Sequence, residues 1–247
     1  MKRFLIALQF LTILPFSIKG KIEKEDFGRS LVYFPIVGLL LGFFLASIAY
    51  ISLSLPPMVR SILILVVWMV ITGGIHLDGF ADTCDGFYGI RPREEILKIM
   101  RDSRIGTMGA AGLAMLLLFK FAILSSIRPE DLWKILVITV VFARWSQVFA
   151  CSMSGYARDD GKAKYFIEYA KKSHMFIGAL FILLLNGFLM GIKGMILFVI
   201  LSAVIFLFIK YAERKIGGMT GDTIGATNEI AEASALIFSL ILLNYKI

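Results

Sequence analysis

Seven long apolar stretches constrain this chain more than any other feature of its sequence. They are residues 31–53, 58–76, 107–127, 132–151, 175–191, 194–210 and 226–244. A helix needs about 20 apolar residues to cross the roughly 30 Å hydrocarbon core of a bilayer, and most of these stretches reach that length. The sequence therefore predicts an all-α, polytopic integral membrane bundle of about seven transmembrane helices, forming one domain over residues 1–247.

Composition excludes several other classes of protein. The chain is 58% hydrophobic and 18% charged, against roughly 45–50% and about 25% in soluble domains. Its net charge of +8 fits basic loops held against anionic lipid, so membrane lipid is the expected surrounding and no nucleic-acid partner is expected. Two cysteines without a CxxC motif and two histidines give no disulfide framework and little support for zinc. The oligomeric state stays open.

The N-terminal segment, residues 1–16, carries Lys2 and Arg3 before an apolar stretch. Pro15 and a charged segment follow instead of a small-residue cleavage site, which argues against a signal peptide. We expect an interfacial or short helix here, and the sequence leaves open whether it spans the membrane.

The basic residues predict the topology. If the N-terminus is cytoplasmic, segments 1–30, 77–106, 152–174 and 210–225 lie inside and hold 19 Lys or Arg, whereas the outside segments hold 5. This split follows the positive-inside rule and puts the long loops, and the chemistry, on the cytoplasmic face of the inner membrane. Lys120, in the outer half of its span, is expected to snorkel outward without a functional role.

The richest motif is residues 73–86, in which Asp78, Asp82 and Asp85 fall at i, i+4 and i+7. These positions share one helix face, so their mutual repulsion at a membrane boundary calls for a positive partner. Mg²⁺ suits carboxylates combined with substrate phosphates. A solvated acidic helix cap or loop is the alternative. His76, one turn earlier, is a candidate general base, phosphate contact or structural histidine.

A second motif is residues 100–109, just before the third apolar stretch. Arg101 and Arg104 are candidate phosphate ligands, and Ser103 with the helix start behind it resembles an anion-binding N-terminus. Asp102 is a candidate metal ligand or a partner for Arg104. The alternative interpretation is a helix cap flanked by arginines that set topology.

A third motif, residues 217–232, combines four glycines with acidic side chains. We expect Gly221 and Asn228 to contact substrate, and Asp222, Glu229 and Glu232 to be candidate metal ligands. The two glutamates lie roughly 5–10 Å below the cytoplasmic end of the last span. Carboxylates at that depth are costly unless they are paired, and interfacial snorkelling is the alternative.

Two arginines complete the candidate site. Arg144 falls at the same depth as Glu229 and Glu232, and pairs either with a glutamate or with a substrate phosphate. Arg158, in a polar cytoplasmic loop, is a candidate substrate contact or only a surface charge. Carboxylates, arginines and glycines on one membrane face predict metal-assisted phosphoryl transfer, in which a carboxylate or a histidine takes a proton from the attacking hydroxyl. Asp82, His76 and Asp85 are the catalytic candidates.

Three motif blocks carry a family resemblance: residues 76–86, 102–109 and 220–229. Together with residues 10–15 and 34–38 they resemble the cobalamin-5′-phosphate synthase family, the adenosylcobinamide-GDP ribazoletransferases, over nearly the whole chain. The resemblance implies that the 3′-hydroxyl of α-ribazole, or of its 5′-phosphate, attacks the phosphate carried by adenosylcobinamide-GDP, that GMP leaves and that Mg²⁺ is required.

The resemblance also carries site residues and small departures. The family's functional aspartates correspond to Asp78, Asp82 and Asp85, of which Asp82 is the first choice for an indispensable metal ligand. Phe80 and Cys84 stand where the family more often has Leu and Ala, which concerns helix packing rather than the metal. Gly155 stands where a Pro is common, so that loop is expected to be looser.

Two other functions share parts of this pattern. A CDP-alcohol phosphatidyltransferase also sets carboxylates on membrane helices around Mg²⁺, but its acidic pairs are separated by a longer interval than those of residues 78–85. A secondary transporter would use Arg144, Glu229 and Glu232 as a relay and would place polar residues near the midplane and on both faces. This chain gathers its polar residues at one face.

Overall fold

The computed structural model describes residues 1–18, 20–161 and 163–244, which form helices and connections without an extended strand. The longer helices are α3 (Phe34–Ile51), α4 (Pro57–Thr72), α7 (Thr107–Ser126), α8 (Pro129–Met153), α10 (Lys172–Met190), α11 (Ile192–Ile216) and α12 (Gly221–Asn244). The shorter ones are α1 (Lys2–Leu11), α2 (Lys24–Ser30), η1 (Leu31–Tyr33), α5 (Ile75–Phe87), α6 (Arg93–Ile99) and α9 (Lys164–Glu168).

Helices of membrane-spanning length occur where the sequence predicts them. Among the described residues, six helical segments are long and apolar enough to cross a bilayer, and the bent pair α4–α5 raises the number to seven if it forms one span. The prediction of a helical polytopic membrane protein is therefore confirmed.

The second predicted span ends earlier than its apolar run. Gly73 and Gly74 adopt φ values of 63° and 66°, in the left-handed region that glycine enters without strain. The chain bends by 92° at this point, between α4 and α5. The acidic motif consequently lies on a helix of its own, set across the end of the bundle, rather than in a loop.

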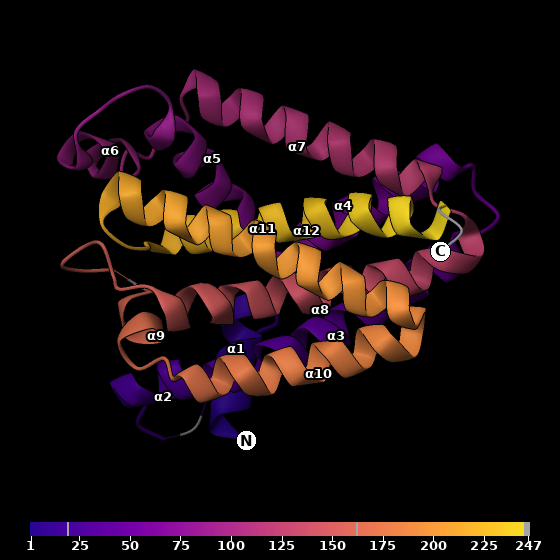
Figure 1. Cartoon of the computed structure of the whole chain (residues 1–247), viewed down its shortest axis with the longest axis horizontal. Coiled ribbons are helices and arrows are strands. Elements are labelled where there is room, and N and C mark those ends of the chain that lie inside the picture. The colour runs from indigo at the N-terminus through magenta and orange to yellow at the C-terminus, as the bar shows by residue number, and fades with distance from the viewer. Residues whose placement is uncertain (19, 162, 245–247) are drawn as a thin grey trace.

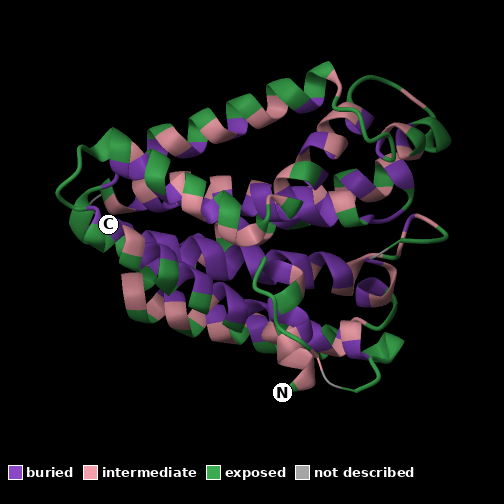
Figure 2. Ribbon diagram, turned by 180° about the vertical axis from the view of Figure 1, so that it is seen from behind, coloured by how far each residue is buried: buried purple, intermediate pink, exposed green. Residues whose placement is uncertain are grey.

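Helix α8 is the centre of the bundle. Its most apolar 18-residue window is 89% buried, compared with 22% for α10 and 28% for α7. Helices α3 and α12 pack along α8, while α7 and α10 lie at the outside of the assembly. Figure 2 shows the buried residues gathered in the middle of the bundle and exposed residues along its outer helices. The exposed side chains of α10 include Phe176, Leu180, Leu184 and Phe188, which form an apolar face suited to lipid.

The two ends of the bundle differ. At one end, α3–α4, α7–α8 and α10–α11 are joined by short connections, whereas α2, α5, α6, α9 and the long connections gather at the other end (Figure 1). This confirms the predicted grouping of the long loops on one side. Three of the basic residues in the topology count, Lys19, Lys162 and Lys246, lie outside the described residues.

The N-terminal helix is short. Helix α1 has ten residues, or about 15 Å of helix, which is half the thickness of a hydrocarbon core. Lys2 and Arg3 pair with Asp26 of α2 at 2.5 and 3.3 Å, and the Ile13 amide donates to the Ile71 carbonyl at 2.9 Å. The structure thus gives the short helix that the sequence predicts, tied to the end of the bundle that carries the long connections.

Candidate active site

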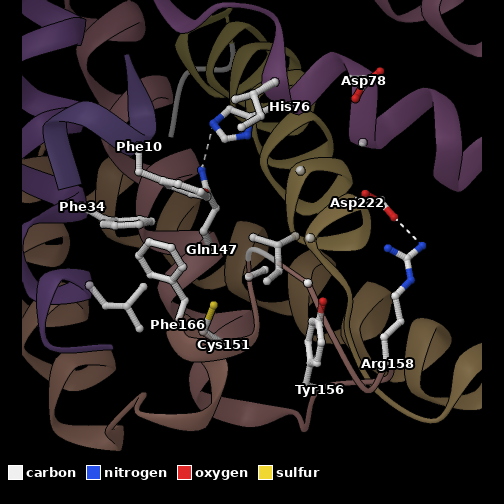
Figure 3. A pocket seen from close by; sticks show the side chains of 18 residues that line it. Phe10, Phe34, His76, Asp78, Gln147, Cys151, Tyr156, Arg158, Phe166 and Asp222 are labelled. Atoms are coloured by element: carbon white, nitrogen blue, oxygen red, sulfur yellow. Dashed lines mark hydrogen bonds and ion pairs between the residues drawn. The ribbon is translucent and has the colours of Figure 1, made fainter. Parts of the chain in front are cut away.

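A cavity of about 300 Å³ opens at the end of the bundle with the long connections. Figure 3 shows its two chemically different ends. The polar end carries Asp78, Asp222 and Arg158, and the other end carries the aromatic rings of Phe10, Phe34 and Phe166, with His76 and Gln147 between the two ends. We call the first the polar end and the second the aromatic end. Gly221 also lines this cavity.

Close packing of α5 on α12 builds the polar end. A Cβ atom at Gly79 would lie 2.7 Å from the Asp222 carbonyl oxygen, so only glycine permits this approach. The contact brings two carboxylates of α5, those of Asp78 and Asp82, toward Asp222 of α12. Asp82 interacts electrostatically with both.

Arg158 supplies the positive charge at the polar end. Its guanidinium is 2.7 Å from the Asp222 carboxylate, and its side chain is only 10% exposed. The loop that carries it is fixed to the start of α12, because the Ala157 amide donates to the Met219 carbonyl at 2.9 Å and the Met219 amide donates to the Gly155 carbonyl at 2.8 Å. Arg158, a candidate substrate contact, is thus fixed in position and is not a freely exposed surface charge.

The donor set at the polar end suits a hard cation. Asp82 and Asp222 interact with Arg158 there, and Asp78 interacts with both of these carboxylates. No three His, Cys, Asp or Glu side chains in the described part of the chain are already arranged to hold a metal ion. Mg²⁺ is commonly held by one or two carboxylates, with water and substrate phosphates completing its octahedron. The residues present fit that mode of binding.

Asp85 shares the α5 face but makes a different contact. Its two carboxylate oxygens accept hydrogen bonds from the backbone amides of Gly106 at 2.7 Å and Gly109 at 2.8 Å. A carboxylate at a helix N-terminus satisfies amides that have no partner within the helix and interacts favourably with its dipole. Asp85 therefore fastens α5 to the start of α7.

The second motif lies outside this cavity. Arg104 donates to Asp102 at 2.8 and 3.0 Å, and these hydrogen bonds lower the pKa of Asp102 to about 2. Of the two roles expected for Asp102, the structure presents the pairing with Arg104. Both residues line a surface cavity of about 680 Å³ at the start of α7. Ser103 is exposed nearby, and Arg101 lines another surface cavity, of about 370 Å³, which shares Arg158 with the main one.

A buried charge network lies beside the cavity, between α7, α8 and α12. Lys120 contacts Glu229 and Glu232, each at 2.5 Å, and Arg144 contacts Glu232 at 2.9 Å. Asn228 accepts a hydrogen bond from Arg144 and donates to Glu232 at 2.9 Å. The expectation that Lys120 snorkels outward is wrong, because two carboxylates hold it in a buried position. Two cations balance two anions, so this arrangement accounts for Glu229 and Glu232 without a metal.

Gln147 joins this network to His76, and sequence reasoning missed it. Its side-chain amide nitrogen donates to Oδ1 of Asn228 at 3.0 Å and lies 3.3 Å from Nε2 of His76. Gln147 follows Arg144 by three residues, so the two share a face of α8. This three-residue spacing from Arg144 is the sequence signal that could have identified Gln147. His76 is buried and lines the cavity at the end of this chain of contacts.

Comparison with known proteins decides the family. The family model for cobalamin-5-phosphate synthase matches residues 3–240. The chain belongs to this family. An adenosylcobinamide-GDP ribazoletransferase of Geotalea daltonii is 37% identical, with 96% of each chain covered. One of Clostridium acetobutylicum is 38% identical, with 96% of this chain and 94% of the relative covered. No solved structure shows a significant match.

Family membership confirms the resemblance and the expectation of an enzyme, a transferase of cobalamin synthesis.

The aromatic end is built partly from residues of the family motifs. Phe10 and Phe34 belong to motif blocks that carry the resemblance, and the sequence assigned neither a role. Phe166 joins them from α9, with ring centroids 4.5 Å from Phe10 and 5.8 Å from Phe34. Nothing in the local sequence around Phe166 points to the cavity.

Proposed function

We propose that this chain is a Mg²⁺-dependent transferase that joins adenosylcobinamide-GDP to α-ribazole, or to its 5′-phosphate, and releases GMP. The names of the relatives supply the donor and the acceptor group. The observation that carries the proposal is the convergence of Asp78, Asp222 and Arg158 at one end of the cavity. Asp82 interacts electrostatically with all three.

The reaction needs positioning and charge neutralisation more than covalent help. A bond forms between the acceptor's 3′-oxygen and the phosphorus next to the cobinamide, and the bond from that phosphorus to the bridging oxygen of GMP breaks. Mg²⁺ held by one or two of the carboxylates of Asp78, Asp82 and Asp222 would supply positive charge to the phosphate oxygens. Arg158 contributes a second positive charge, and its ion pair with Asp222 keeps its guanidinium at the polar end.

The hydrogen-bond directions in the network bear on the proton acceptor. Arg144 donates to Oδ1 of the Asn228 side chain, so Gln147 must present its side-chain amide nitrogen to that same oxygen. The same nitrogen faces Nε2 of His76 and donates to it. The ring proton of His76 then lies on Nδ1, which makes this histidine a donor. We therefore assign acceptance of the hydroxyl proton to a carboxylate of the polar end, with Asp82 as first candidate.

We also propose that the end with the long connections faces the cytoplasm, in the inner membrane. The excess of Lys and Arg in the segments of that end supports this orientation.

The experiment uses purified protein in liposomes, adenosylcobinamide-GDP and α-ribazole, and follows GMP with added Mg²⁺ or with EDTA. We expect release with Mg²⁺ and none with EDTA. Asp82→Asn should lose at least a hundredfold in rate while keeping its helical circular dichroism. Asp160→Asn is the matched control, because that side chain is 96% exposed. Release that ignores EDTA, or equal rates in both variants, would contradict the proposal.

A further inference from the structure

We propose that the aromatic end of the cavity binds the base of the acceptor nucleoside, while the corrinoid donor stays outside and presents only its diphosphate to the polar end. This inference rests on the proposed function and assigns one of its two substrates to a place. It predicts selectivity for a planar base that carries few hydrogen-bonding groups.

Size is the first argument. The cavity holds about 300 Å³, at the lower end of the roughly 300–1,000 Å³ range of small-molecule sites. That is room for a single nucleoside and too little for a corrin macrocycle with its side chains. The larger openings of about 680 and 370 Å³ lie on the surface. Arg158 lines both the latter and the main cavity, which puts the guanidinium of the polar end within reach of a bulky donor bound at the surface.

The chemistry of the aromatic end is the second argument. Phe10, Phe34 and Phe166 come from α1, α3 and α9 and form one cluster, with ring centroids 4.5–6.0 Å apart. Leu31 and Cys151 extend this wall. A planar aromatic base stacks favourably on such rings, beyond the gain from the area it buries. A base with an exocyclic amine would leave polar groups unpaired against these side chains, which disfavours its binding.

The order of residues along the cavity is the third argument. Figure 3 shows the three phenylalanine rings on one side and Asp78, Asp222 and Arg158 on the other. A nucleoside with its base at the aromatic end directs its ribose toward the polar end, where the attacking hydroxyl has to be. The reverse orientation would put the ribose hydroxyls against phenyl rings and leave them without partners.

The test measures the Michaelis constants for α-ribazole and for adenosylcobinamide-GDP separately, in Phe166→Leu and Phe10→Leu. Leucine keeps an apolar side chain but removes the ring. We expect the constant for α-ribazole to rise about tenfold, equivalent to about 1.4 kcal/mol, with that for the donor unchanged. Phe188→Leu is the control, because its ring is 87% exposed on the outer face of α10.

A second readout does not depend on transfer. Equilibrium dialysis of radiolabelled α-ribazole, without donor, should show weaker binding to both cavity variants and unchanged binding to Phe188→Leu. A rise in the donor's constant alone, or equal losses in all three variants, would overturn the inference. If the wild-type protein binds α-ribazole but transfers nothing, the proposed function fails while the assignment of the aromatic end stands.

Discussion

Removal of the Lys120 charge is the sharpest structural test of the buried network. In Lys120→Met an unbranched apolar side chain replaces an ammonium group that lies 2.5 Å from both Glu229 and Glu232. Arg144 would then be the one cation of this network facing two buried carboxylates. Because the side chains of Glu229 and Glu232 are 5% and 2% exposed, water cannot replace the lost partner.

The loss of stability depends on whether the glutamate that loses its partner stays charged or takes up a proton. Leaving a buried charge unpaired costs about 3–5 kcal/mol. The glutamate escapes by taking up a proton, which at pH 7 costs about 3–4 kcal/mol for a side chain that is ordinarily ionised. Polar contacts between membrane helices average only about 0.6 kcal/mol, but that average does not describe a buried charge left without a partner. We therefore expect a loss of about 3 kcal/mol.

The assay is reversible unfolding in mixed micelles of increasing SDS fraction, followed by tryptophan fluorescence. Lys134→Met is the matched control. Lys134 pairs with Asp131 near the start of α8 and is 30% exposed. Asp131 also keeps its contact with Arg128 at 2.6 Å, so the loss of Lys134 should cost less than about 1 kcal/mol. Lys120→Met combined with Glu229→Gln should recover at least half of the lost stability. A cost equal to that of the control, or no recovery in the double variant, would refute the reasoning.

Three further predictions follow from other contacts. Gly79→Ala should lower stability by about 1–3 kcal/mol, because its Cβ would meet the Asp222 backbone at 2.7 Å, whereas Gly155→Ala meets nothing within 4 Å and should be neutral in the same unfolding assay. Asp85→Asn should lower the melting temperature, since an amide has one acceptor oxygen for two backbone donors, yet leave the Mg²⁺ concentration for half-maximal rate unchanged. Asp160→Cys should react with an impermeant maleimide only from the cytoplasmic side of sealed vesicles; labelling from outside would contradict the topology.

The sequence predicts the spans well because hydropathy is a local property. It misplaces the end of the second span because no charged residue interrupts the stretch between Arg60 and His76, although Gly73 and Gly74 mark the bend. Helical spacing correctly put three aspartates on one face of α5. It could not show that Asp85 would turn to the amides of α7, because that choice depends on where a later helix begins.

Contacts between helices that are far apart in the sequence were what the sequence predicted least well. The depth of Lys120 in its span predicts a snorkelling side chain. Its two carboxylate partners lie more than 100 positions later in the chain, so the local sequence gives no sign of them. The aromatic end has the same character. Its rings come from α1, α3 and α9, and the chain contains 21 phenylalanines, so composition and spacing could not single out these three.

The most direct test of the central claim is the stoichiometry of the reaction. Purified wild-type protein in liposomes, given Mg²⁺ and both substrates, should release one GMP for each cobalamin, or cobalamin 5′-phosphate, formed. Little GMP should form without α-ribazole or its 5′-phosphate. GMP released from the donor alone at the same rate would identify a hydrolase, and no GMP from a folded preparation would contradict the account.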